Sequence, residues 1–95
     1  MVTLHIEHSI TDFDVWKAAF DRFAEVRAES GVRGHCVLRP VDDECSVVVD
    51  LNFQTVDEAK KFLHFLKTMV WASADAASAL VGTPHARILQ LAEAS

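Results

Sequence analysis

The sequence has little positive charge, because nine Lys and Arg residues stand against fourteen Asp and Glu, giving a net charge of −5 with neutral histidines. Nucleic acids and anionic membrane surfaces are bound through basic patches, so this composition argues against both as partners. Long apolar runs are also missing. The least charged stretch, residues 68–86, is interrupted by Asp75, Gly82 and Pro84, and it therefore predicts no transmembrane helix.

Cysteines and common catalytic motifs are equally scarce. Cys36 and Cys45 form neither a metal-binding spacing nor a disulfide framework, and we expect both to be small apolar core residues in a reducing compartment. There is no glycine-rich phosphate loop, no Gly-x-Ser-x-Gly elbow and no Cys-x-x-Cys pair. The chain leads directly into a strand rather than through a basic and then apolar leader, so we expect a cytoplasmic protein.

What the sequence does contain is a regular alternation at its start. Ninety-five residues with 51% hydrophobic side chains predict one globular domain, residues 1–95, small enough to gain stability from pairing with a second copy. Residues 2–8 predict a strand whose successive side chains point to opposite faces. Its apolar face needs a core and carries Val2, Leu4 and Ile6, whereas its polar face carries Thr3, His5 and Glu7.

The rest of the chain predicts two long helices and three more strands. A first helix runs to about Ser30 from a capping box of Thr11 and Asp14, and Gly31 ends it. Strands follow over 32–40 and 45–53, joined by an acidic turn. Thr55 and Glu58 form the capping box of a second helix, whose apolar stripe is Ala59, Phe62, Leu63, Leu66, Met69 and Val70.

After Trp71, Ser73 is expected to cap a short Ala-rich helix that ends at Gly82, and the last strand covers 85–91. The order strand, helix, strand, strand, helix, strand is the α+β, ferredoxin-like βαββαβ pattern. Right-handed crossovers give a four-stranded antiparallel sheet in the order 4-1-3-2, with a short extra helix before the last strand. Both long helices then cover the same face of the sheet.

The opposite face of this sheet has no cover within one chain. Its mixture of histidine, arginine, acids and aliphatic groups suits a polar cavity shared between two sheets better than a plain solvent face. The residues assigned to this open face are Thr3, His5, Glu7, Arg33, His35, Val37, Arg39, Ser46, Val48, Asp50, Asn52, His85, Arg87 and Leu89.

The chain resembles a known superfamily in its length, its order of elements, the stretch Gly31-Val32-Arg33-Gly34 and the stretch Asp50-Leu51-Asn52-Phe53-Gln54-Thr55. It looks like the dimeric α/β-barrel superfamily, and most like small uncharacterised actinobacterial members related to antibiotic-biosynthesis monooxygenase-like and cyclase-like proteins. The resemblance implies a homodimer that joins its open sheet faces into a barrel. It also implies a cavity for a small ligand, either between sheet and helices or within the barrel.

The first candidate site lies on the open face. His5 and Asp50 belong to neighbouring strands, and a carboxylate that holds one imidazole nitrogen raises the basicity of the other. We therefore interpret His5, Asp50 and His85 as candidate catalytic residues: His5 as the base, Asp50 orienting it, and His85, Arg33 or Arg87 stabilising an enolate or phenolate. The alternative interpretation is a polar network that only fixes how two copies pair.

A second group of residues is assigned to ligand binding: Glu7, Arg33, His35, Arg87 and Trp71. Trp71 could form an aromatic wall of a ligand site or simply pack under the short helix. His5, Glu7, His35 and His85 offer donors for a metal, but their spacing is not that of a metal site, so none is predicted. Haem degraders of the superfamily combine a first-strand Asn with a Trp and a His. This chain has His5 and Glu7 on that strand, so we predict no cofactor.

Three functions agree with these observations. The first is a cofactor-independent monooxygenase or cyclase/isomerase acting on a small aromatic or polyketide-like molecule. The second is a non-catalytic dimer that binds a small ligand or serves in a stress response. The third is a self-association module. The residues alone leave open whether the chain is an enzyme.

Overall fold

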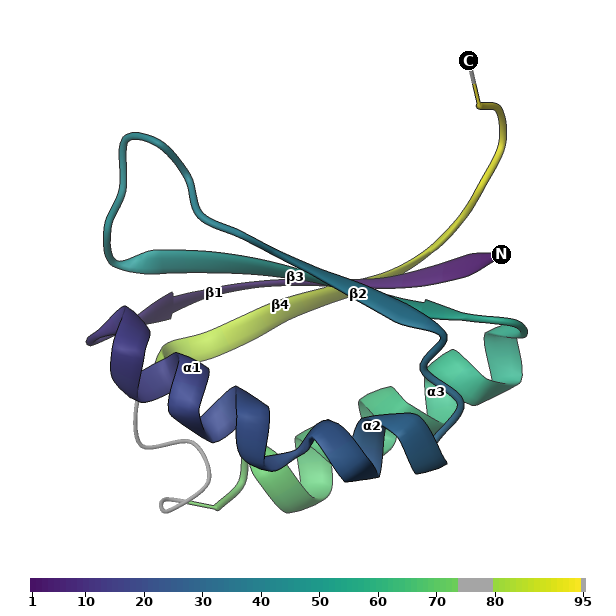
Figure 1. Ribbon diagram of the computed structural model, residues 1–95, viewed down its shortest axis with the longest axis horizontal. Helices are drawn as coiled ribbons and strands as arrows, with labels where there is room; N and C mark the ends of the chain where they lie inside the picture. The colour runs from purple at the N-terminus through teal and green to yellow at the C-terminus, as the bar shows by residue number, and fades with distance from the viewer. Residues whose placement is uncertain (74–79, 95) are drawn as a thin grey trace.

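A computed structural model describes residues 1–73 and 80–94 of the chain. Its elements are β1 (Val2–Ile10), α1 (Phe13–Arg22), α2 (Ala24–Glu29), β2 (Gly34–Leu38), β3 (Ser46–Phe53), α3 (Val56–Phe65), a π-helical turn η1 (Leu66–Val70) and β4 (Leu80–Gln90). The strands form one antiparallel sheet in the order β2-β3-β1-β4, which is the predicted order read from the other edge. Figure 1 shows the helices on a single side of this sheet. The predicted α+β ferredoxin-like fold is confirmed.

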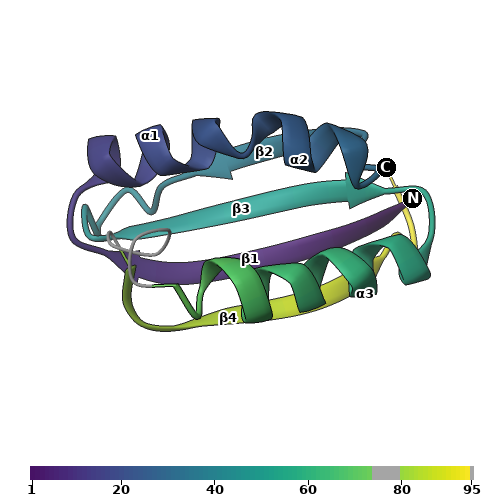
Figure 2. The ribbon, with the colours of Figure 1, turned by 90° about the horizontal axis from the view of Figure 1, so that it is seen from below.

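The core lies between the sheet and two rows of helices. In Figure 2, α1 and α2 run along the β2–β3 side and α3 runs along the β1–β4 side. β1 is central, and its predicted apolar residues Val2, Leu4 and Ile6 are buried among Trp16 of α1, Phe62 of α3 and the inward residues of β3. Burial of large apolar side chains, worth roughly 1.5–3 kcal/mol each, makes this layer the main source of stability.

The first helical segment differs from its prediction at both ends. Asp12, not Thr11, is the N-cap, since its carboxylate accepts a hydrogen bond of 3.0 Å from the amide of Val15. The helix is also interrupted at Phe23, whose φ of −97° and ψ of 13° separate α1 from α2. Gly31 has the predicted left-handed backbone, with φ at +94°.

The second helix begins as predicted and ends in an unexpected way. Thr55 and Glu58 form the reciprocal capping box. Beyond α3 the backbone widens into η1, where the amide of Trp71 donates to the carbonyl of Leu66, five residues back, at 2.7 Å. The wider turn shifts the helical phase, so Met69 is 63% exposed and does not belong to the buried stripe.

Strand β2 faces the other way from the prediction. Cys36 pairs with Asp50 and Val37 pairs with Val49, so Cys36 lies on the open face and Val37 faces the helices. The assignment of residues 33, 35, 37 and 39 to the open face was therefore wrong. β2 is an edge strand, and the ring of His35 packs 5.4 Å from that of Phe20 on the helix side.

Cys36 and Cys45 are exposed, so the expectation that both are small apolar core residues was wrong. Cys36 is exposed because β2 turns it toward the open face, opposite to the predicted orientation. Cys45 precedes β3, in the turn where its amide donates to the carboxylate of Asp43 at 2.9 Å. The low pKa of the Asp43 carboxyl has the same origin, because the Ser46 hydroxyl and this amide both donate to it.

The last strand begins earlier than predicted. β4 starts at Leu80 and includes Gly82, with φ at +74°, and Pro84, so no helix extends to Gly82. Residues 74–79, where most of the short extra helix was predicted, lie outside the described residues. The register of β1 against β4 shifts between Glu7 and Ser9, and β4 is an edge strand, a place where Pro is tolerated.

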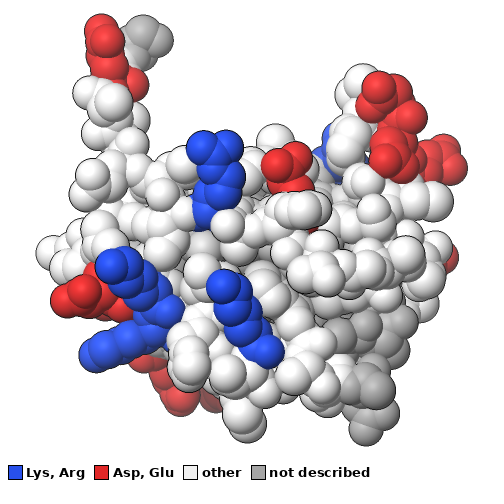
Figure 3. Space-filling view, turned by 180° about the vertical axis from the view of Figure 1, so that it is seen from behind, with Lys and Arg blue, Asp and Glu red and all other residues white. Residues whose placement is uncertain are grey.

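The face of the molecule seen from behind has no broad basic patch (Figure 3). Figure 3 shows basic side chains gathered over α3 and acidic ones at the turn between β2 and β3. The outer side of α3 and η1 is solvated, because Lys60, Lys61 and Lys67 are exposed. Among the described helices, none is long and apolar enough to cross a membrane.

Candidate functional site

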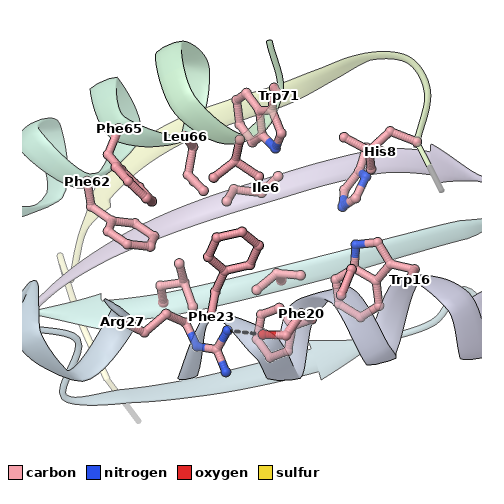
Figure 4. A pocket seen from close by; sticks show the side chains of 15 residues that line it. Ile6, His8, Trp16, Phe20, Phe23, Arg27, Phe62, Phe65, Leu66 and Trp71 are labelled. Atoms are coloured by element: carbon pink, nitrogen blue, oxygen red, sulfur yellow. Dashed lines mark hydrogen bonds between the residues drawn. The ribbon is translucent and has the colours of Figure 1, made fainter. Parts of the chain in front are cut away.

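A cavity of about 80 Å³ lies on the helix side of the sheet, between the two rows of helices. Figure 4 shows it between α1 and α2 on one side and α3 and η1 on the other, with β1 and β3 at its base, and the cavity is partly open to solvent. Its wall is mainly aromatic and aliphatic. The aromatic members are Trp16, Phe20, Phe23, Phe62, Phe65 and Trp71.

Two backbone irregularities shape this wall. The interruption at Phe23 sets the boundary between α1 and α2, and the Phe23 side chain lines the cavity. The π-helical turn η1 carries Trp71 to the opposite side of the same cavity. Widened helical turns of this kind are common at functional sites. Trp71 thus lines a cavity, which its predicted role as an aromatic wall of a ligand site requires.

His8 is the first polar group in the cavity. It is only 8% exposed, its ring lies 5.8 Å from that of Trp16, and its Nδ1 is buried without a hydrogen-bond partner among the described residues. Burial lowers the pKa of His8 to about 4, because a charged imidazolium is poorly solvated there. The ring is therefore neutral at pH 7, with one donor and one acceptor nitrogen available to a ligand.

Arg27 is the second polar group. It is 7% exposed, and its guanidinium lies 3.7 Å from the ring centre of Phe20, a cation–π contact. Its Nη1 donates to the backbone carbonyl of Phe20 at 2.5 Å. Burial lowers the pKa of Arg27, whereas the charge of Asp21 acts in the opposite direction. Within the described residues no carboxylate forms an ion pair with it; Asp21 pairs with Lys17 at 2.6 Å.

The sequence contained signals for both groups that the prediction did not use. His8 has the same strand parity as Val2, Leu4 and Ile6, so the alternation that predicted the core also directs His8 into it. Arg27 follows Phe20 by seven residues and Phe23 by four, the spacing of one helical face. Trp16 is a buried residue of the core, and it also lines the cavity.

The predicted open-face cluster exists as a second polar group. His5 Nδ1 lies 2.6 Å from Asp50 Oδ1, and His5 Nε2 lies 3.4 Å from Glu7 Oε2. In the sheet register Arg87 stands opposite His5, and His85 stands opposite Glu7. The predicted proximity of these five residues is confirmed, whereas their catalytic and ligand-binding roles stay predictions.

Three predicted ligand-binding residues lie away from this cluster. The Arg33 guanidinium donates to the side-chain oxygen of Gln54 at 2.7 Å, and His35 packs against Phe20 on the helix side. Trp71 lies on the helix side as well, so the sheet separates it from His5. In the part of the chain that the structure describes, no three His, Cys, Asp or Glu residues converge as a metal site.

Comparison with known proteins gives structural likeness only. No family model matches the chain, and no curated protein matches its sequence. A mutant form of SnoaB, a cofactor-independent oxygenase from Streptomyces nogalater, superposes with a TM-score of 0.76 at 18% identity, covering 98% of this chain and 94% of SnoaB.

Two further structures share the architecture. A proposed antibiotic biosynthesis monooxygenase from Nitrosomonas europaea gives a TM-score of 0.72 at 15% identity, covering 98% of this chain and all of that one. A dimeric ferredoxin-like protein from an uncultured marine organism gives 0.67 at 7% identity, covering 99% and 97%. At these identities the comparisons establish the fold, and that fold is the ferredoxin-like one of the antibiotic biosynthesis monooxygenase-like proteins.

Proposed function

We propose that this protein is a cofactor-independent monooxygenase that oxidises a small aromatic or polyketide-like molecule inside the cavity between sheet and helices. The observation that carries the proposal is an aromatic cavity containing a buried histidine nitrogen that has no hydrogen-bond partner among the described residues. The structural likeness to SnoaB, a cofactor-independent oxygenase, supports the reaction class. Apolar walls with a few convergent polar groups are typical of small-molecule sites.

The chemistry requires the substrate itself to supply electrons to oxygen. A phenol or an activated methylene becomes electron-rich when it loses a proton, so the protein needs a base next to the bound ring. His8 is placed for this role, because its buried ring is neutral at pH 7 and can accept a proton. Its pKa of about 4 makes it a weak base in the empty cavity, so the role requires the ligand anion formed beside it to raise that pKa. For a methylene the balance is R₂CH₂ + O₂ → R₂C=O + H₂O.

The His5–Asp50 pair is the alternative position for the base. Its short contact, 2.6 Å, is the geometry that orients an imidazole, and His85 stands nearby on β4. The two positions lie on opposite faces of the sheet, so a substitution of one histidine leaves the other in place. Kinetic comparison of the two variants therefore decides between them.

We also propose that the protein is a homodimer joined through the open sheet face. One structural neighbour is a dimeric ferredoxin-like protein, and the open face here presents exposed Leu38 and Leu89 around the polar cluster. A small domain with an uncovered sheet gains buried area by pairing in this way. The polar cluster would then lie inside the interface.

The test is oxygen consumption by metal-free protein in the presence of chelator, with a panel of phenols, hydroquinones and single-ring compounds that carry an activated methylene, followed by mass analysis of the products. We expect uptake of O₂ with one or more of these, and a loss of about 10²- to 10⁴-fold in kcat for His8→Gln. His5→Gln is the matched variant, and the exposed His64→Gln is the control. If only His5→Gln lowers kcat, the base is His5 on the open face rather than His8.

Binding without turnover would instead support the non-catalytic ligand-binding dimer. Haem is the competing ligand of the superfamily, and haemin is therefore included in the binding panel. The cavity of about 80 Å³ is much smaller than the roughly 300–1,000 Å³ of pockets that hold drug-sized ligands, so we expect no saturable shift of the haemin absorption band.

A further inference from the structure

Arg27 is a buried cation that faces an apolar cavity. A charge removed from water in this way is costly unless it is paired, and the described residues supply Arg27 with one backbone carbonyl and one aromatic face but with no ion pair. A positive charge held at the wall of a cavity is most useful when the ligand carries a negative charge. Arg27 is therefore the group in this cavity whose environment indicates the chemistry of the ligand.

The local structure holds the guanidinium in a fixed orientation. The Phe20 ring lies against its face, and the Phe20 carbonyl, near the interruption between α1 and α2, accepts from Nη1. Only one of the five N–H donors of Arg27 is used among the described residues. A planar guanidinium with unused donors matches a carboxylate or a phenolate oxygen, and it can bind a carboxylate with two parallel hydrogen bonds.

His8 marks a second polar point in the same cavity. In Figure 4, His8 lies beside Trp16 at one end of the cavity, and the Arg27 guanidinium lies apart from it, beside Phe20. Both side chains are more than nine-tenths buried, and both line the cavity. The polar groups of a ligand are thus expected at two separated points, with an apolar ring between them.

We propose that the cavity binds an aromatic molecule bearing an anionic group, a carboxylate or a phenolate, which Arg27 holds while a hydroxyl or acidic hydrogen faces His8. The proposal names the substrate class for the site proposed above and rests on that site, although it is tested by binding rather than by turnover. A cavity of roughly 150 Å³ accepts benzene, and this cavity of about 80 Å³ is smaller, so the proposal requires its side chains to move apart before a single ring can enter.

The chain supplies its own probe of occupancy. Trp16 and Trp71 are its two tryptophans, and both line the cavity, so their fluorescence reports on a bound ring. Wild-type protein is titrated with benzoate and with benzamide, which has the same shape without the charge. We expect saturable quenching by benzoate, with an affinity about 10- to 100-fold above that for benzamide, as hydrogen bonds to charged groups provide.

Arg27→Met keeps the apolar stem and removes the charge. We expect it to lose the preference for benzoate while binding benzamide within about twofold of wild type, and Arg27→Lys to retain part of the preference. Arg39→Met is the matched control, because Arg39 also stacks on a phenylalanine, with its guanidinium 4.3 Å from the ring centre of Phe13, but does not line the cavity. It should bind both molecules as wild type does. Circular dichroism verifies that each variant is folded.

Three results overturn the proposal: no saturable benzoate binding, equal affinities of wild type for the two molecules, or a benzoate preference that survives in Arg27→Met. Its failure differs from failure of the proposed oxidation. Oxygen uptake with neutral phenols but no benzoate preference removes only the role of Arg27. A benzoate preference without oxygen uptake removes the enzyme and leaves a binding site for aromatic anions.

Discussion

His5 Nδ1 lies 2.6 Å from Asp50 Oδ1 across neighbouring strands, on the face of the sheet that the helices leave open. Both side chains are half-buried in one subunit, with exposed fractions of 26% and 32%. A polar contact of this kind at a surface contributes little to stability, whereas the same contact enclosed between two subunits is expected to be strongly coupled. The strength of this contact therefore reports on whether a second copy covers the open face.

A double-mutant cycle of His5→Ala and Asp50→Ala measures that strength. We expect a coupling free energy of about 1–3 kcal/mol when unfolding by urea is followed at high protein concentration, where the proposed dimer would form. At a concentration low enough to give monomers, the coupling should fall to about 0.2–1 kcal/mol, the range for exposed pairs. Equal coupling at the two concentrations would mean that the open face stays in water.

Leucines on the open face provide a second test of pairing. Leu38 is an exposed residue of β2 at the edge of this face, and Leu38→Asp places a charge in the proposed interface. We expect the dissociation constant of the dimer, measured by sedimentation, to rise at least about tenfold, because an unpaired charge would lose water on association. Val41→Asp is the control, since Val41 is fully exposed in the turn after β2. Comparable effects of the two variants would exclude this interface.

The fold was predictable because its main signals are redundant. The alternation of β1, the capping box at Thr55 and the order of elements all favour one topology, and each agrees with the structure. For the edge strand β2, no second sequence signal indicated which of its two faces is the inner one. Cys36 and Leu38 alternate with His35 and Val37, so either face could be the inner one, and pairing with β3 decided in favour of Val37.

The candidate cavity was less predictable than the sheet. It depends on the interruption at Phe23 and on the π-helical turn before Trp71, and neither has a clear local sequence signal. His8 and Arg27 could have been found from strand parity and helical spacing. His8 and Arg27 were missed because the sequence does not show which residues surround a titratable or charged side chain on an apolar face. Their surroundings become clear only when the two rows of helices are placed against the sheet. The His5–Asp50 contact was found because strand pairing alone determines it.

The buried position of His8 predicts a specific loss of stability in acid. The unfolded chain binds a proton at this residue near the ordinary pKa of 6.5, and the folded chain does so only near 4. Between these values the unfolded state binds more protons, so the free energy of unfolding falls as the pH falls. From pH 7 to pH 5 the contribution of His8 is about 2 kcal/mol.

Urea unfolding at the two pH values checks this contribution. His8→Phe should lose about 2 kcal/mol less than wild type between pH 7 and pH 5, since it has no group to protonate. His64→Gln, which changes an exposed histidine on α3, should lose as much as wild type. If His8→Phe and wild type lose the same amount, His8 is not held neutral in the folded protein.

The two cysteines form a matched pair of probes for the open face. Cys36 lies opposite Asp50 on that face, whereas Cys45 lies in the turn before β3, and both thiols are exposed in one subunit. Cys45→Ser leaves Cys36 as the single thiol, and Cys36→Ser leaves Cys45.

With a charged thiol reagent under native conditions, we expect Cys36 to react at least about tenfold more slowly at high protein concentration than after dilution, because pairing removes it from solvent. Cys45 should react at one rate throughout. Equal rates for Cys36 at all concentrations would place the interface elsewhere, and parallel slowing of both thiols would indicate association that does not use the open face specifically.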